Sequence, residues 1–228
     1  MAKRHVMIAM PVYTGMVHTS TMRSLLSDAV LLASSGWAIT LNDQCGNTLI
    51  DEARSECVHL FLQSGATDLV FVDWDVCWPP GSMKQILDHP VDVVGGIYPK
   101  RQDPIEFNVR TREEGAYPVD PATGLIDVLG LHAGFLRITR KAALAMVDHY
   151  RDALTYDRNG KQIVHLFERY RVPGTTQMLG EDYSFCQRWI DMGGKCWLDP
   201  GFQMGHIGLK MYVGQFGKFV AQPEKDAA

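Results

Sequence analysis

Two aspartates separated by one residue stand in the segment Asp73-Trp74-Asp75, directly after an apolar run at 69–72. In an extended segment, residues i and i+2 point to the same side, so both carboxylates can reach one ligand. Their hard oxygens suit Mg²⁺ or Mn²⁺, which commonly keep water and substrate phosphates in the remaining positions. An Asp-x-Asp pair is also common as a strand end followed by a solvated turn, so further segments have to support a metal site.

Three other segments carry residue types that fit the same site. The loop Pro11-Val12-Tyr13-Thr14-Gly15 offers backbone N–H groups, a hydroxyl and an aromatic face to a nucleotide, although it also fits a plain strand-to-helix turn. Glu181 and Asp182 open a helix, where acidic residues also serve as caps. His206, between glycines, is a candidate third metal ligand, and a structural histidine is the alternative.

The elements that would position these residues alternate regularly. Strand, helix, strand, helix and strand are predicted at 6–10, 19–36, 37–41, 48–64 and 68–72. This order indicates a parallel α/β sheet. Open sheets of this kind bind ligands at the carboxyl ends of their strands, which is where Asp73 stands.

The rest of the chain is predicted with less regular order. We expect a short helix from the turn at 79–82 to His89, a strand at 91–97, an irregular stretch at 98–130 with short strands near Phe107 and Ile126, a strand at 134–138, a helix at 140–150, a loop region at 151–179, a helix at 181–192 and a strand at 196–198. Residues 1–221 are expected to form a single domain, followed by a flexible tail at 222–228.

Composition narrows the classes of protein. Of the 228 residues 46% are hydrophobic, which is ordinary for a globular protein. The net charge of -4 argues against a general nucleic-acid binder, which usually has a basic balance. No run approaches the roughly 18 apolar residues of a membrane helix, so no membrane span is expected. The five cysteines are scattered without a CxxC pair, which favours reduced thiols and a cytoplasmic protein.

Taken in order, these segments resemble the nucleotide-sugar glycosyltransferases of the GT-A fold, near family 2, and small glycosyltransferase-like proteins of phages and bacteria. The resemblance runs from Val6 to about Gly208. The matching segments are LVFVDWDV at 69–76, VVGGIY at 93–98, AGFLRI at 133–138, GEDYSFC at 180–186 and the late His206. It implies a GT-A (Rossmann-like) α/β fold with a mixed, mainly parallel central sheet flanked by helices.

The resemblance also implies how a donor would bind. A uridine-type nucleotide such as the UDP of a UDP-sugar would lie on the loop after the first strand. The donor-binding residues would be Pro11, Tyr13 and Thr14 at base and ribose, Asp43 near the base, Arg54 facing the phosphates, and His132 with Gly134 facing the sugar. The donor sugar itself stays open.

Metal and catalytic roles follow from the same resemblance. Asp75 would bind Mn²⁺ or Mg²⁺ directly, Asp73 would contact ribose or metal water, and His206 would complete the metal shell. Asp182 would be the general base and Glu181 would position the acceptor. A base in this role gives inversion at the anomeric carbon, whereas a retaining enzyme would not need it.

Some features depart from the larger family members. The segment after Asp43 is short, and the late Gln-x-x-Arg-Trp element of processive synthases is missing. We therefore expect a soluble enzyme that makes single transfers to an acceptor hydroxyl. A small molecule, a glycan, a protein or a modified DNA base all remain open as acceptor.

Three alternatives remain open. In the first, DNA is the acceptor and its phosphates contact the basic residues Lys100, Arg101, Arg110 and Arg112, which otherwise form a solvated loop. In the second, the protein is a nucleotidyltransferase, but the loop at 11–15 lacks the Gly-rich basic sequence of that class. In the third, it binds a nucleotide or partner without catalysis, against which the intact acidic residues argue.

Overall fold

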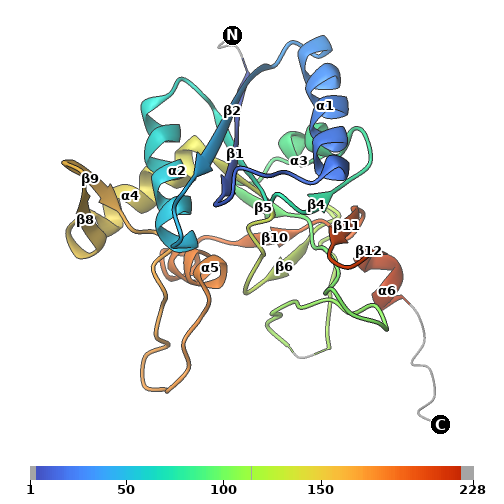
Figure 1. Ribbon diagram of the computed structural model, residues 1–228. Coiled ribbons are helices and arrows are strands. Elements are labelled where there is room, and N and C mark those ends of the chain that lie inside the picture. The colour runs from blue at the N-terminus through green and yellow to red at the C-terminus, as the bar shows by residue number, and fades with distance from the viewer. Residues whose placement is uncertain (1–3, 114, 222–228) are drawn as a thin grey trace.

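A seven-stranded sheet forms the centre of the computed structural model, which describes residues 4–113 and 115–221 (Figure 1). The predicted tail at 222–228 lies outside the described residues. Across the sheet the strands are β2 (Ala38–Cys45), β1 (His5–Val12), β3 (Asp68–Val72), β7 (Phe135–Thr139), β5 (Val93–Gly95), β10 (Cys196–Leu198) and β6 (Ile126–Val128).

Five of these seven strands run in one direction. β2, β1 and β3 are parallel neighbours, and β5 and β10 are parallel to each other. β7 is antiparallel to β3 and β5, and β6 is antiparallel to β10. The predicted fold class, an α/β fold with a mixed, mainly parallel central sheet flanked by helices, is confirmed.

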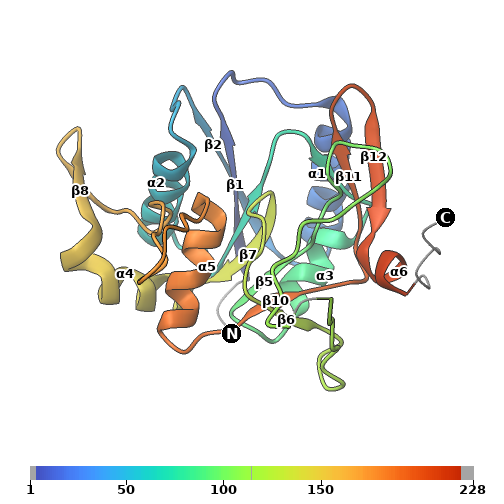
Figure 2. The ribbon, with the colours of Figure 1, turned by 90° about the horizontal axis from the view of Figure 1, so that it is seen from below.

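Helices cover both faces of the sheet (Figures 1 and 2). On one face lie α1 (Thr19–Ser34) and α3 (Ser82–Asp88), and on the other lie α2 (Ile50–Gln63), α4 (Arg140–Leu154) and α5 (Glu181–Asp191). The two-residue period of β1 explains this. Ile8 packs in the same buried cluster as Leu25 of α1, whereas Met7 and Ala9 belong to the cluster of Phe61 on α2. A strand that is apolar on both sides has to be covered on both sides.

A second, three-stranded sheet lies beside the first and was not predicted. It has the order β12 (Met211–Gln215), β11 (Gln203–Ile207) and β4 (Val76–Cys77), and α6 (Phe216–Val220) follows it. β4 directly follows the Asp73–Asp75 segment, so this small sheet fixes the position of the acidic pair.

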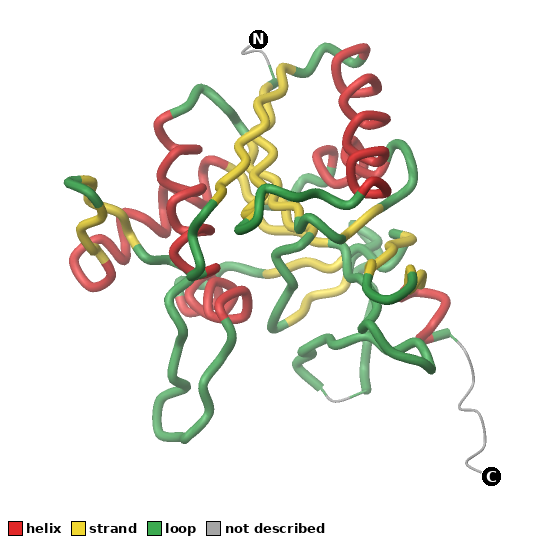
Figure 3. Tube along the Cα trace, viewed as in Figure 1, coloured by secondary structure: helices red, strands yellow, loops and turns green. Residues whose placement is uncertain are grey.

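The predicted loop region at 151–179 is partly wrong. α4 continues to Leu154, and β8 (Thr155–Arg158) and β9 (Lys161–Val164) form a hairpin. The turn between them is Asn159-Gly160, and both residues have positive φ, which is the signature of a tight hairpin turn. Residues 165–179 do run mainly as a loop (Figure 3).

The predicted strand near Phe107 is also wrong, whereas β6 confirms the one near Ile126. Of the described residues at 98–113, only Arg110 makes a strand-like bridge, to Gly130. Phe107 instead packs edge-on against Phe216 and Phe219 around α6. Its apolar character reflects this aromatic contact and not a strand.

Asp28 of α1 anchors the turn that follows the acidic pair. Its buried carboxylate accepts hydrogen bonds from Trp78 Nε1 at 2.8 Å, Met83 N at 2.8 Å and Gly81 N at 2.5 Å. A buried carboxylate with several donors is well satisfied, so this contact holds the β4–α3 connection in place. No helix in the described part of the chain is long and apolar enough to cross a bilayer.

Candidate active site

A cavity of about 660 Å³ opens at the carboxyl ends of β1, β3 and β5. These strands run in one direction, and antiparallel β7 begins at the same edge, so four loops meet there. The N-terminal end of α2 adds a fifth wall. The cavity is lined by Pro11, Tyr13, Asn47, Thr48, Ile50, Arg54, Asp73, Trp74, Asp75, Tyr98, Pro99, Lys100, Arg101, Asn108, His132 and His206.

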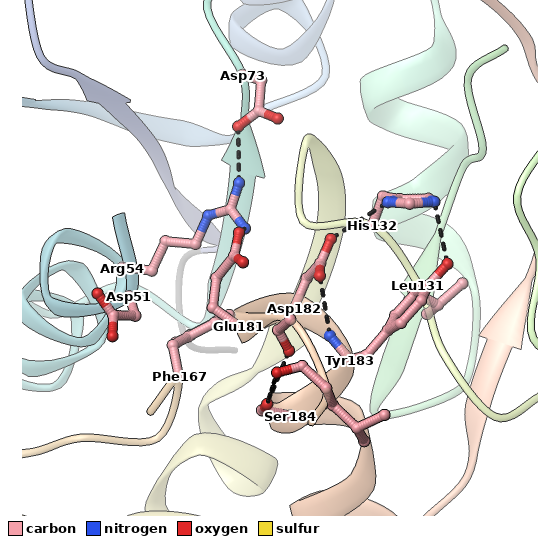
Figure 4. Close-up of polar contacts among 12 residues, drawn as sticks. Asp51, Arg54, Asp73, Leu131, His132, Phe167, Glu181, Asp182, Tyr183 and Ser184 are labelled. Atoms are coloured by element: carbon pink, nitrogen blue, oxygen red, sulfur yellow. Dashed lines mark hydrogen bonds and ion pairs between the residues drawn. The ribbon is translucent and has the colours of Figure 1, made fainter. Parts of the chain in front are cut away.

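Arg54 of α2 joins two of the predicted acidic residues (Figure 4). Its guanidinium donates to Glu181 Oε1 at 2.8 Å and to Asp73 Oδ1 at 3.0 Å, and it is 4% exposed. Burial alone would lower the pKa of Arg54, but the Asp73 and Glu181 carboxylates outweigh burial and raise it. Burial raises the pKa of Glu181 although Arg54 opposes that shift. Asp73 and Glu181, which are far apart in the sequence, therefore share the guanidinium of Arg54.

Gly134 is what allows Asp73 and Tyr98 to meet. Tyr98 Oη donates to Asp73 Oδ2 at 3.3 Å, and Asp73 N donates to Gly134 O at 3.1 Å. A Cβ at Gly134 would lie 2.6 Å from Asp73 Oδ2 and 2.5 Å from Tyr98 Oη. Sequence reasoning missed Tyr98 as a site residue, although its place just after a parallel strand was a usable signal.

His132 forms a hydrogen-bonded pair with Asp182. The two meet at 3.2 Å between Nδ1 and Oδ2 (Figure 4). His132 Nε2 lies 2.9 Å from the carbonyl oxygen of Asn108. A carbonyl only accepts, so Nε2 carries a proton, and the contact with Asp182 holds a second one.

The pKa shifts of the pair place that second proton on the imidazole. Burial would lower the pKa of His132, but the hydrogen bond to Asp182 raises it. Burial would raise the pKa of Asp182, but His132 lowers it. Both shifts favour an ionised Asp182 carboxylate paired with a protonated His132 ring.

Asp75 and His206 meet on the other side of the cavity. Asp75 is 3% exposed, and its Oδ2 lies 3.9 Å from His206 Nε2. The small sheet brings them together, because His206 pairs with Val76 and Ile207 N donates to Asp75 O at 2.8 Å. His206 Nδ1 donates to Pro99 O at 2.9 Å, which leaves a lone pair on Nε2 of the neutral ring. Burial lowers the pKa of His206 and so favours that neutral form.

A divalent cation fits Asp75 and His206, but not the three-ligand shell expected. Across residues 4–113 and 115–221, no three His, Cys, Asp or Glu side chains gather as a metal site. Asp73 instead faces Arg54 and Tyr98. One carboxylate and one imidazole, whose other nitrogen donates to a carbonyl, suit a cation that takes its further ligands from water and phosphate. In this structure the Arg101 guanidinium pairs with Asp75 Oδ2 and provides the positive charge beside that carboxylate.

The remaining predicted donor residues are spread out. Pro11 and Tyr13 line the cavity, and Tyr13 is largely exposed there. Thr14 does not line it, and its hydroxyl accepts from Met16 N at 3.3 Å. Asp43 is exposed on the edge strand β2 and also lies outside the lining. The structure thus gathers most, but not all, of the predicted donor residues.

The basic residues considered for DNA contact are each paired within the chain. Lys100 bonds to Glu106 at 3.0 Å and Arg112 to Asp127 at 3.2 Å. Arg110 lies over the ring of Tyr183, and Arg101 pairs with Asp75. They do not form a free basic stripe.

Comparisons with known proteins support the fold alone. No protein-family model and no curated protein sequence matches the chain. The crystal structure of A197 from STIV is similar with a TM-score of 0.51 and 15% identity, over 90% of this chain and 86% of A197. A glycosyltransferase involved in the glycosylation of the major capsid of PBCV-1 aligns with a TM-score of 0.33 and 11% identity, over 65% of this chain and 67% of that one. The chain shares its overall fold with A197, and its function has to be argued from the cavity.

Proposed function

We propose that this chain is a glycosyltransferase that moves a sugar from a UDP-type nucleotide-sugar to an acceptor hydroxyl, with a divalent cation and with inversion. The observation that carries the proposal is the acidic cluster at the carboxyl edge of the sheet. Asp73 and Glu181 share Arg54, and Asp182 follows on the same helix turn. Ligands of open α/β sheets bind at this edge.

The cavity suits a nucleotide-sugar in size and chemistry. Its volume of about 660 Å³ lies within the usual range for ligand sites, roughly 300–1,000 Å³. Pro11 and exposed Tyr13 offer a flat apolar surface to a base and ribose. Asp75 and His206 would hold Mn²⁺ or Mg²⁺ against the diphosphate, and that cation would neutralise the charge of the leaving group.

Asp182 acts as the general base for the acceptor hydroxyl. As the acceptor oxygen bonds to the anomeric carbon, the bond from that carbon to the diphosphate oxygen breaks, and the diphosphate leaves with the electron pair. Asp182 takes the proton released by the acceptor hydroxyl. His132 orients Asp182 and keeps it ionised, and Arg54 holds Glu181 beside it.

The proposal is tested by release of UDP from a panel of UDP-sugars in the presence of Mn²⁺, with and without added acceptors. We expect turnover with at least one donor, and a loss on the order of 10²- to 10⁴-fold in Asp182→Asn, the usual contribution of a general base. Asp191→Asn, at the far end of the same helix, is the matched control and keeps its turnover. Its carboxylate accepts a hydrogen bond from Gln187 Nε2 at 2.8 Å, in the neighbouring turn of the helix.

Two outcomes would contradict this function. Folded wild-type protein that binds UDP but turns over no nucleotide-sugar would indicate a non-catalytic binding protein. Pyrophosphate release from UTP and a sugar phosphate would indicate a nucleotidyltransferase. NMR of the product's anomeric proton would test inversion separately from transfer.

A further inference from the structure

The Asp75 carboxylate forms an ion pair with a basic side chain of the same protein. The Arg101 guanidinium pairs with Asp75 Oδ2, the oxygen that also faces His206 Nε2 at 3.9 Å. The Asp75 side chain is 4% exposed, whereas that of Arg101 is 43% exposed. An ionised carboxylate this deeply buried needs a positive partner. Arg101 supplies it from the loop after β5.

The side chain of Arg101 lies against Gly208, the residue that follows β11. A Cβ on Gly208 would lie 3.0 Å from Arg101 Cδ, so the side chain lies directly over this glycine. The neighbouring Lys100 also lines the cavity, yet it pairs with Glu106 and not with the acidic pair. Of these two adjacent cations, Arg101 is the one placed on the candidate metal ligand.

We propose that Arg101 is an exchangeable counter-ion, which neutralises Asp75 until a divalent cation binds and then moves to the phosphates of the nucleotide. This inference rests on the proposed function, because it needs a cation and a diphosphate in the cavity. Two positive groups at Asp75 Oδ2 would repel each other, so the cation has to displace Arg101. The displaced side chain stays at the cavity, where a diphosphate offers it paired oxygens.

The exchange couples the two ligands. Without nucleotide, displacement of Arg101 costs free energy and weakens cation binding. With nucleotide, Arg101 gains a new partner, so the nucleotide strengthens cation binding, and the cation strengthens nucleotide binding by the same factor. Removing the guanidinium should abolish the competition and reduce the coupling.

The experiment is a Mn²⁺ titration that follows the electron paramagnetic resonance signal of free Mn²⁺, with and without UDP. We expect UDP to tighten Mn²⁺ binding to wild type by about tenfold or more, within the usual range of coupling between sites. In Arg101→Gln, Mn²⁺ without UDP should bind about tenfold more tightly than in wild type, and the further gain on adding UDP should be smaller. Arg101→Lys keeps the charge and should lie closer to wild type.

Lys100→Gln is the matched control, because it removes one positive charge from the adjacent residue of the same cavity. Its Mn²⁺ affinity without UDP should stay at the wild-type value. An equal rise in Lys100→Gln would assign the effect to net charge and overturn the exchange, and so would an unchanged affinity in Arg101→Gln. If UDP-sugar turnover persists in those cases, only the exchange fails. If wild type binds neither Mn²⁺ nor UDP, the exchange and the proposed function both fail.

Discussion

His132 and Asp182 meet at 3.2 Å although one precedes β7 and the other lies in the first turn of α5. The imidazole is fixed on its far side by the carbonyl of Asn108, so it presents a proton to the carboxylate. This contact lowers the pKa of Asp182 against the effect of burial. The contact with His132 therefore favours the ionised form of the Asp182 carboxyl.

Replacing His132 should therefore move the pH dependence of turnover. In His132→Gln, burial acts on Asp182 without opposition from the imidazolium, so the pKa of Asp182 rises. Asp182 has to be ionised to accept a proton, so the acid limb of the kcat/KM profile should shift to higher pH. Turnover should fall more at pH 5.5 than at pH 8. A uniform loss at every pH would mean that His132 only shapes the cavity.

Gly134 gives a steric test of the Asp73 site. In Gly134→Ala the new methyl group overlaps Asp73 Oδ2 and Tyr98 Oη, so these side chains have to move. We expect a loss of stability of about 1–3 kcal/mol, as for other overpacked sites, and a larger loss of UDP affinity. Thermal unfolding and calorimetric UDP titration measure the two effects.

Gly65→Ala is the matched control for that variant. No atom lies within 4 Å of the Cβ it would add, so stability and UDP affinity should stay close to wild type. Unchanged UDP affinity in folded Gly134→Ala would show that the placement of Asp73 and Tyr98 does not matter for the nucleotide.

Removing the shared cation should make stability depend on pH. In Arg54→Met, Asp73 and Glu181 lose their common partner, which should cost up to about 3 kcal/mol of unfolding free energy, less than for a fully buried pair because both carboxylates are partly open to water. The pKa of Glu181 is already raised by burial, and without Arg54 it rises further.

The sign of that dependence follows from proton uptake. A carboxyl with a raised pKa in the folded state binds its proton more tightly when folded, so stability falls as pH rises through that pKa. Urea midpoints of Arg54→Met should therefore lie closer to wild type at pH 5 than at pH 8. A deficit that is larger at pH 5 would contradict the assignment of Glu181 to Arg54.

The apolar periodicity of the sequence predicted most strands of the main sheet. The features that it did not predict depend on pairing between segments far apart in the sequence. Asp73 could be placed because a buried strand leads directly to it. His206 could be named as a candidate, but its approach to Asp75 depends on β4, a strand of only two residues that pairs with a distant segment. Such a strand has no periodicity to detect.

Two other misses have different causes. Arg101 lies in an irregular loop, where neither periodicity nor caps indicate the direction of a side chain, and its partner is again Asp75. The β8–β9 hairpin did carry a local signal, because Asn159-Gly160 is a preferred hairpin turn. Strand positions around that turn are mostly polar, so the apolar pattern used for the other strands did not reveal it.

Chelation and ligand replacement should test Asp75 and His206 together. With UDP present, Mn²⁺ should raise the thermal unfolding midpoint of wild type, because a ligand that binds the folded state stabilises it, and EDTA should reverse the gain. Asp75→Asn should abolish the Mn²⁺-dependent part. His206→Gln, which removes the imidazole lone pair at Nε2, should weaken Mn²⁺ binding by at least about tenfold.

His149→Gln, on the exposed face of α4, is the control and should respond as wild type does. A full Mn²⁺ response in Asp75→Asn would place the cation elsewhere, because Asp75 is the carboxylate that pairs with His206 Nε2 among the described residues.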